Sequence, residues 1–219
     1  MSRPRLLDLF SCAGGAAMGY HRAGFEVVGV DINPQPRYPF EHHVGDAIEF
    51  ARLHGHEFDA VHASPPCQTF TAYRRRGAGV GDDYLNLIPE TREVLQEIGR
   101  PYVIENVEMA RGELIDPVCY CGSSFGLNVR RHRLFESNMP LNPPPCDHAW
   151  QTPRFPPATN RTNLRRTVEV GVWRIPLATQ REAMGIDWME LRELSEAIPP
   201  AYTEHIGRQL ISHLQEVNA

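Results

Sequence analysis

The chain has 219 residues, of which 42% are hydrophobic and 22% charged, and its formal net charge is -5. This length gives room for one α/β domain plus a small insertion. No apolar run approaches the ~20 residues that a membrane-spanning helix needs, and the N-terminus does not resemble a secretory signal. We therefore expect a cytoplasmic, monomeric protein with no membrane partner, whose five cysteines form no disulfide framework.

The first elements in the chain predict the start of a parallel sheet. Residues 6–10 read as a short buried strand, and a turn of small residues follows them. Residues 16–23 read as a helix that ends at Gly24, and residues 25–30 as a second strand that ends at Asp31. This strand–helix–strand order is typical of an α/β fold with a doubly wound, mostly parallel sheet.

The later segments continue the alternation of helix and strand. We expect further helices over 47–53, 85–98, 179–184 and 206–217, and further strands over 58–63, 101–104, 134–136 and 168–175. Seven prolines fall in the twenty residues from Asn138 to Pro157, which indicates irregular chain. These patterns divide the chain into a main domain over 1–137, a small insertion over 138–177 and a C-terminal segment over 178–219 that packs back on the main domain.

A small-residue turn, Ser11-Cys12-Ala13-Gly14-Gly15, joins the first predicted strand to the first helix. Glycines at such a turn let a ligand approach the backbone and the helix N-terminus, although a tight turn without a ligand is the alternative. Asp31 favours a nucleotide-like ligand, because an acid at the end of the second strand can hold a pair of ribose hydroxyls. The turn does not match G-x-G-x-x-G, which disfavours a dinucleotide.

Two more polar positions fall at predicted strand ends. Cys67 lies in Ser-Pro-Pro-Cys-Gln directly after the strand at 58–63, and Glu105 follows the strand at 101–104. Because carboxyl ends of parallel strands line the ligand crevice, Cys67 is a candidate nucleophile. Glu105 can act as an acid if burial raises its pKa. The alternatives are a structural cysteine and a polar side chain that orders a loop.

Basic residues occur in clusters despite the negative net charge. Arg131 and Arg133 are separated by one residue, so on a strand both would point the same way and could face one cleft, or a solvated edge. Residues 74–76 are three arginines in a Gly-rich loop, and residues 161–166 are also rich in arginine. A basic cleft for a nucleic acid therefore stays possible.

The order of these motifs carries more information than any one of them. Phe-Ser-Cys-Ala-Gly-Gly, then Pro-Pro-Cys-Gln, then Glu-Asn-Val, then Arg-His-Arg-Leu-Phe-Glu resembles the ordered motifs of the DNA (cytosine-5)-methyltransferase family. The resemblance runs over residues 6–137 and resumes over 178–210. It implies a Rossmann-like S-adenosylmethionine-dependent methyltransferase fold, here with a small irregular target-recognition insertion.

The resemblance also implies a reaction and its residues. A methyl group would pass from S-adenosylmethionine to carbon 5 of cytosine through a covalent Cys67 adduct, with the base flipped out of double-stranded DNA. The implied catalytic residues are Cys67, Glu105, Arg131 and Arg133. The implied cofactor residues are Phe10, Ser11, Cys12, Gly14, Gly15, Asp31, Ile32, Asp46 and Pro66. The implied substrate and DNA residues are Gln68, Arg74, Arg75, Arg76 and Asn106.

Two other functions stay open at this point. The insertion of 40 residues is very small for the family, which leaves room for cytosine methylation of a free nucleotide or RNA, or for an inactive DNA-binding relative. The reaction itself needs no metal. A set of three thiols and one imidazole could nevertheless bind zinc tetrahedrally, the alternative being scattered reduced cysteines. This set is Cys119, Cys121, Cys146 and His148.

Overall fold

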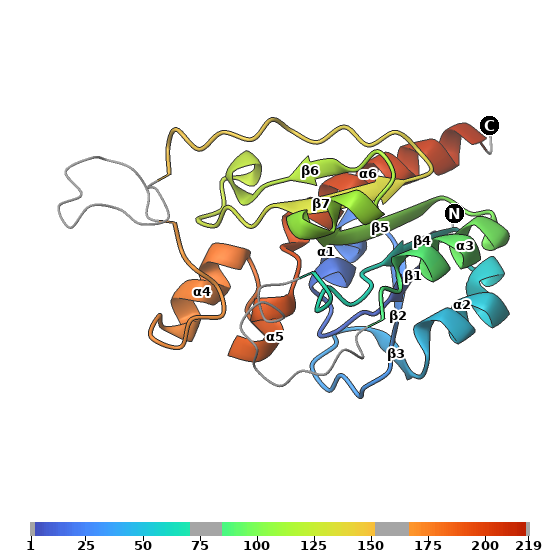
Figure 1. Ribbon diagram of the computed structural model, residues 1–219, viewed down its shortest axis with the longest axis horizontal. Coiled ribbons are helices and arrows are strands. Elements are labelled where there is room, and N and C mark those ends of the chain that lie inside the picture. Colours follow the sequence, from blue (N-terminus) through green and yellow to red (C-terminus); the bar gives the residue numbers. More distant parts are fainter. Residues whose placement is uncertain (1–2, 71–84, 152–166, 218–219) are drawn as a thin grey trace.

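The computed structural model describes residues 3–70, 85–151 and 167–217, and within them seven strands form one mixed sheet in the order β3-β2-β1-β4-β5-β7-β6 (Figure 1). The strands are β1 (Arg5–Leu9), β2 (Glu26–Asp31), β3 (Glu41–Val44), β4 (Ala60–Ala63), β5 (Tyr102–Val107), β6 (Val118–Tyr120) and β7 (Arg133–Ser137). Strands β1 to β5 pair in parallel, and β7 runs antiparallel to both β5 and β6. The predicted α/β fold with a doubly wound, mostly parallel sheet is therefore confirmed.

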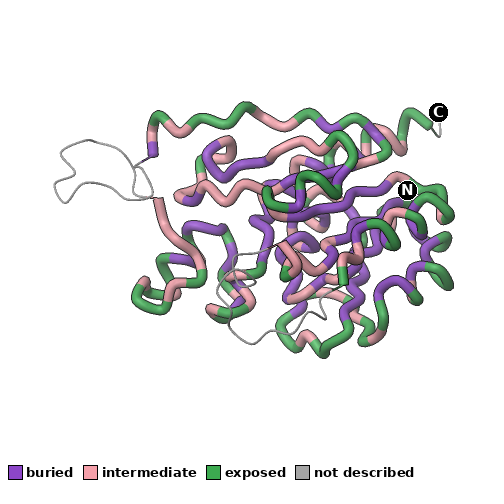
Figure 2. Tube along the Cα trace, in the orientation of Figure 1, coloured by how far each residue is buried: buried purple, intermediate pink, exposed green. Residues whose placement is uncertain are grey.

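Helices cover both faces of this sheet. They are α1 (Gly15–Ala23), α2 (Ala47–His54), α3 (Ile88–Ile98), α4 (Leu177–Met184), α5 (Leu191–Glu196) and α6 (Pro200–Val217). Neighbouring side chains of a strand point to opposite faces. Leu7 of β1 accordingly packs in a core with α2 and α3, whereas Leu6 packs in a second core with α1 and α6. Figure 2 shows the central strands as the most buried part of the molecule.

Helix α6 packs along α1 at close range. Gly19 of α1 allows this, because a Cβ added there would lie 2.0 Å from Oγ1 of Thr203. The Thr203 hydroxyl donates to the carbonyl oxygen of Ala16 at 2.8 Å. Gly207 makes a second close approach, since an added Cβ would lie 2.7 Å from Cβ of Ala23. The C-terminal segment is thereby fixed to the helix that follows the first strand.

Several elements differ from the sequence-based expectation. Strands β3 and β6 and helix α5 were not predicted, and α6 begins at Pro200, six residues before its predicted start. The expected strand at 168–175 is wrong, because this segment forms turns. The buried side chain of Gln180 causes this: it accepts the N–H of Gly171, which has a φ of 87°, and donates to the carbonyl oxygens of Val172 and Ile175. No helix in the described part of the chain is long and apolar enough to cross a membrane.

Candidate active site

A cavity of about 220 Å³ opens at the carboxyl ends of β1, β4 and β5. This is the edge at which doubly wound sheets bind their ligands. Its wall combines the turn after β1, residues 64–68 after β4, the end of β5, the first residue of β7 and residues from 189 to 198. The structure thus brings Cys67, Glu105, Arg133 and the small-residue turn together in one cleft, as the motif order predicts.

The turn after β1 has an unusual backbone. Phe10, Cys12 and Gly14 all have positive φ, at 57°, 43° and 82°. Two of these three are not glycine, and such strained conformations often occur at ligand sites. The hydroxyl of Ser11 is buried and has no hydrogen-bond partner within the described chain. An unpaired buried hydroxyl and a strained backbone both fit a turn that is completed by a polar ligand.

Asp31 at the end of β2 supports this turn. Its Oδ2 accepts the N–H of Cys12 at 3.0 Å, and its Oδ1 accepts the N–H of Asn33 at 2.9 Å. The neighbouring Ile32 is 65% exposed, as expected for an apolar side chain that packs on a ligand. Asp46 caps α2, where its Oδ1 accepts the N–H groups of residues 48 and 49. This capping role was missed, although an acid directly before a helix is its usual signal.

Only some of the predicted cofactor residues line the cavity. Within the described chain, the wall contains Phe10, Ser11, Cys12, Gly15 and Pro66 but not Gly14, Asp31, Ile32 or Asp46. Gly14 belongs to the turn itself, and Asp31 lies at the end of β2 and holds the turn through its bond to Cys12. The wall also contains Asp8, Met189, Glu193 and Glu196, which sequence reasoning did not assign. Met189, Glu193 and Glu196 belong to no local sequence motif. They reach the cleft only through the tertiary fold.

Glu105, Arg133 and Cys67 form the reactive end of the cleft. The guanidinium Nε of Arg133 lies 3.1 Å from Oε1 of Glu105, and the Glu105 side chain is only 8% exposed. Burial raises the pKa of Glu105, and Arg133 and the Ser64 hydroxyl act in the opposite direction. Burial and then Glu105 raise the pKa of Cys67, which Arg133 partly offsets. The free protein therefore holds a protonated thiol beside a carboxyl group that takes up a proton more readily than usual.

The loop that carries Cys67 is held by Asn106 of β5. Pro65 and Pro66 have no N–H and end the ladder of β4. The side-chain amide of Asn106 donates to the carbonyl oxygen of Pro65 at 2.9 Å, and Asn106 is 1% exposed. This contact makes Asn106 a positioning residue for the loop, and its substrate contact stays a prediction. Gln68 lies in the cavity wall.

A buried chain of polar side chains lies behind Glu105. The hydroxyl of Tyr20 lies 3.0 Å from Nδ1 of His62, and Nε2 of His62 lies 3.0 Å from the Ser64 hydroxyl, which in turn bonds to Glu105. Tyr20 and His62 are fully buried, and burial lowers the pKa of His62 to about 3, so its ring is neutral. Sequence reasoning missed both, although a histidine inside the apolar strand β4 was a signal.

Arg131 does not lie beside Arg133 on a strand, so that prediction is wrong. Strand β7 begins only at Arg133, and Arg131 has a φ of 40°. Its guanidinium donates to the carbonyl oxygens of Ala197 at 2.8 Å and Ser195 at 2.7 Å. Burial and the nearby Arg133 lower the pKa of Arg131 to about 9. Arg131 therefore fixes the wall at 195–197, while Arg133 faces Glu105.

The other predicted clusters have mixed outcomes. Residues 74–76 and 161–166 lie outside the described residues, so the expected DNA contacts of Arg74, Arg75 and Arg76 stay predictions. Of the four candidate zinc ligands, Cys121, Cys146 and His148 lie together, with His132 as the fourth member of the group. Cys119 packs against the hydrophobic core instead.

Comparison with known proteins gives one family. A family model described as C-5 cytosine-specific DNA methylase matches residues 4–113. The Type II methyltransferase M.HgiGI of Herpetosiphon aurantiacus is 31% identical over 121 residues, which cover 49% of this chain and 93% of that protein. M.HgiDI of the same organism is 31% identical over 49% of this chain, and M.AquIA of Picosynechococcus is 28% identical over 59%. The chain spans only 38% and 64% of the lengths of these last two relatives.

Solved structures of low identity share the fold. The Entamoeba histolytica methyltransferase EhMeth superposes with a TM-score of 0.61 and 12% identity, covering 98% of this chain and 99% of that one. A putative DNA modification methyltransferase from an Escherichia coli prophage gives 0.56 and 15%, covering 97% and 99%. The family-model match over half of the chain and the match across 93% of M.HgiGI show that this chain belongs to the C-5 cytosine-specific DNA methylase family.

Proposed function

We propose that this chain transfers a methyl group from S-adenosylmethionine to carbon 5 of cytosine in double-stranded DNA, with Cys67 as the covalent nucleophile and the target base flipped out of the helix. One observation carries the proposal. Cys67, Glu105 and Arg133, which lie far apart in the sequence, line one cleft together with the strained turn after β1. A binding protein without catalysis has no need for a thiol and a buried carboxyl group in that arrangement.

The residues of the turn fit S-adenosylmethionine, which supplies an electrophilic methyl group when it is bound. The unpaired Ser11 hydroxyl and the open backbone of the turn suit the polar part of the molecule. Each carboxylate oxygen of Asp31 accepts one backbone N–H and keeps a lone pair for a ribose hydroxyl. Ile32 offers an exposed apolar side chain to the adenine ring, and Asp46 can accept from the adenine amino group.

The protein's own groups account for the activation of cytosine. Carbon 5 is a poor nucleophile, and addition of the Cys67 sulfur at carbon 6, with loss of the thiol proton to a base, converts the ring into an enamine that can accept a methyl group. Negative charge then develops at nitrogen 3, where a protonated or proton-sharing Glu105 stabilises it. Arg133 holds the Glu105 carboxyl group in place. Loss of the carbon 5 proton to a base then returns the electron pair that expels the Cys67 thiolate.

Binding of DNA requires positive charge that the net charge of -5 does not suggest. We assign phosphate contacts to the arginines at 74–76, which follow the nucleophile directly in the sequence. Phosphate contacts fix orientation and add affinity without reading sequence.

The test is transfer of a radiolabelled methyl group to duplex DNA, RNA and dCMP in parallel reactions. We expect transfer to DNA and its loss in Cys67→Ser, with cofactor binding retained. Transfer to RNA or dCMP but not DNA would contradict the assigned substrate, and cofactor binding without any transfer would identify an inactive relative.

DNA that carries 5-fluorocytosine tests the nucleophile separately. Fluorine cannot leave as a proton does, so the wild-type chain should stay covalently attached to the DNA. An adduct that persists in Cys67→Ser would assign the nucleophile to another residue.

A further inference from the structure

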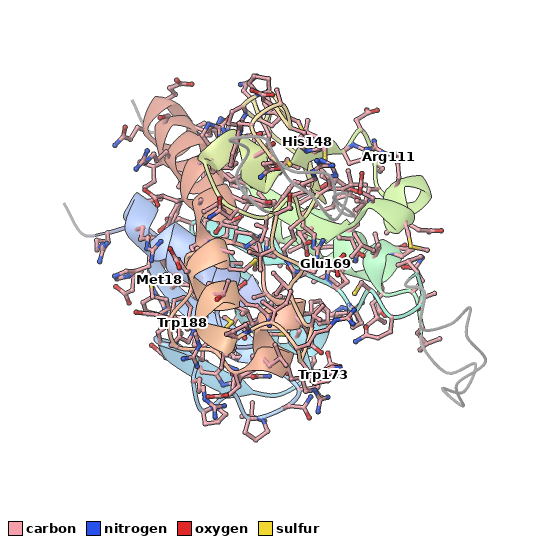
Figure 3. All side chains as sticks on the ribbon, turned by 90° about the vertical axis from the view of Figure 1, so that its left-hand side faces the viewer. Met18, Arg111, His148, Glu169, Trp173 and Trp188 are labelled. Atoms are coloured by element: carbon pink, nitrogen blue, oxygen red, sulfur yellow. The ribbon has the colours of Figure 1, made fainter. Side chains whose placement is uncertain are left out.

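Four metal-binding side chains meet at the β6–β7 edge of the sheet, and none of them belongs to the wall of the cleft. They are Cys121, His132, Cys146 and His148, and their ligand atoms all lie within 4.8 Å of one another. Figure 3 shows His148 at the top of the molecule, and Trp173 at the bottom. We propose that this group is a structural zinc site with two thiolate and two imidazole ligands, and the proposal does not depend on the proposed methyl transfer.

The fold brings these residues together from three separate segments. Strands β6 and β7 pair antiparallel, with Cys119 opposite Leu134 and Tyr120 opposite Arg133. Continuing that register by one residue places Cys121 opposite His132. The Pro-rich segment then passes over this edge and adds Cys146 and His148 (Figure 1). Because the first two ligands follow from strand pairing, half of the site is fixed by the sheet itself.

The distances fit tetrahedral zinc. Nε2 of His148 lies 3.3 Å from the sulfur of Cys121 and 3.0 Å from the sulfur of Cys146. Nε2 of His132 lies 3.4 Å from the sulfur of Cys146. With Zn–S of about 2.3 Å and Zn–N of about 2.0–2.1 Å, a tetrahedral ion holds sulfur and nitrogen roughly 3.6 Å apart. Small side-chain shifts therefore make room for the ion.

Neighbouring groups orient the ligands in the way that zinc sites require. Oε2 of Glu108 lies 3.4 Å from Nδ1 of His132, which leaves Nε2 to face the sulfurs. Such a carboxylate–imidazole pair is the usual support of a histidine ligand. The Ser123 hydroxyl donates to the sulfur of Cys121 at 3.1 Å and lies 3.7 Å from that of Cys146. Hydrogen bonds to sulfur stabilise thiolates.

The arrangement also argues against simpler explanations. A disulfide between Cys121 and Cys146 would need only the two sulfurs and would leave two imidazole nitrogens directed at them without a partner. Cys119 shows what an ordinary cysteine does in this region, because it packs against the core. Four protein ligands leave no open position, so the site is structural and not catalytic.

The site has a consequence for the cleft. His132 lies between Arg131, which holds the wall at 195–197, and Arg133, which faces Glu105. Bound zinc would fix the backbone between these two arginines and attach the Pro-rich segment to the sheet edge. An insertion with seven prolines in twenty residues has few apolar side chains for a core of its own, and a metal replaces that core.

The experiment measures metal in the full chain, purified under reducing conditions from zinc-supplemented cells. Mass spectrometry of the metal should give one zinc per chain in the wild type. Cys146→Ser and His132→Ala should lose it, and the matched control Cys119→Ser should keep it. Glu108→Gln should keep the site but weaken zinc binding about 10–100-fold in a competition with a chelator, the range for loss of a supporting carboxylate.

A second measurement does not depend on the variants folding. Wild-type protein stripped of metal should bind one cobalt ion and show the intense visible absorption of tetrahedral cobalt with thiolate ligands. Absence of both zinc and the cobalt spectrum would overturn the proposal. So would zinc loss in Cys119→Ser equal to that in Cys146→Ser, or a native mass lower by two hydrogens with Cys121 and Cys146 in one disulfide-linked peptide.

Discussion

The ion pair between Arg92 of α3 and Glu136 of β7 should be costly to break, because it is mostly buried and bidentate. Nε and Nη2 of Arg92 donate to the two carboxylate oxygens of Glu136 at 2.6 and 2.7 Å, and the side chains are 13% and 2% exposed. Arg92 also donates to the carbonyl oxygen of Glu113, and Glu136 accepts the N–H of Ile115. The pair therefore attaches α3 and the segment at 113–115 to the strand that begins with Arg133.

Arg92→Met keeps most of the aliphatic volume but leaves a buried carboxylate without its cation. Removal of one partner of a buried ion pair costs about 3–5 kcal/mol in the free energy of unfolding. In a chain of this size each kcal/mol lowers the melting temperature by roughly 2–4 °C. We therefore expect a fall of roughly 6–20 °C, measured by calorimetry, with urea denaturation giving the free energy directly.

The matched control is Arg92→Met combined with Glu136→Gln. The neutral amide still accepts the N–H of Ile115, but no unpaired charge remains in the interior. The double variant should be more stable than Arg92→Met by at least ~1 kcal/mol, the lower end of the cost of an unsatisfied buried group. A loss below ~1 kcal/mol in the single variant, which is the range of a surface pair, or a double variant no more stable than the single, would refute this reasoning.

Three further predictions concern the cleft and the DNA. Asp31→Ala should weaken S-adenosylmethionine binding by about 1–3 kcal/mol in calorimetry, and an unchanged affinity would place the cofactor elsewhere. Glu105→Gln should lower the pKa of Cys67 and Arg133→Gln should raise it, because the carboxylate disfavours the thiolate and the guanidinium favours it. The rate of Cys67 alkylation by iodoacetamide should accordingly rise at lower pH in Glu105→Gln and at higher pH in Arg133→Gln than in the wild type. Identical pH profiles for the wild type and both variants would exclude this coupling. Replacing the three arginines at 74–76 with alanine should weaken binding to any DNA and flatten its salt dependence by about one unit of slope per lost contact; an unchanged slope would leave this segment without the proposed role.

Candidate site residues that directly follow a strand could be predicted from the sequence. Cys67 and Glu105 follow buried strands that were recognisable from their apolar runs, and the doubly wound topology then brings these ends to one edge. The small-residue turn and Asp31 were found in the same way, because the first strand–helix–strand unit is continuous in sequence. Local periodicity and a topological rule together were sufficient for this part of the site.

Contacts between distant segments were beyond local pattern reading. The wall from 189 to 198 is held by contacts with distant residues, among them the bonds from Arg131 to the carbonyl oxygens of Ser195 and Ala197, and no motif predicts these contacts. Arg131 was misplaced because its left-handed backbone is stabilised by tertiary contacts, among them the Tyr202 hydroxyl on its carbonyl oxygen. His132 was not proposed as a metal ligand, because the pairing of β6 with β7 was not predicted.

The buried chain from Tyr20 to Glu105 has a direction. While Glu105 is ionised, the Ser64 hydroxyl donates to it, so Ser64 must accept from Nε2 of His62, and Nδ1 must accept from Tyr20. A neutral imidazole carries only one ring proton. When Glu105 is protonated and donates to the Ser64 hydroxyl, Ser64 must donate to Nε2 of His62. The ring proton then lies on Nδ1, which donates to the Tyr20 hydroxyl. The tautomer of His62, readable from its two ¹⁵N resonances, thus records the charge of a carboxyl group in the cleft from a fully buried position. Through Tyr20, the same event reverses a hydrogen bond on helix α1, so proton uptake at the reactive end of the cleft is recorded on the helix that covers this face of the sheet.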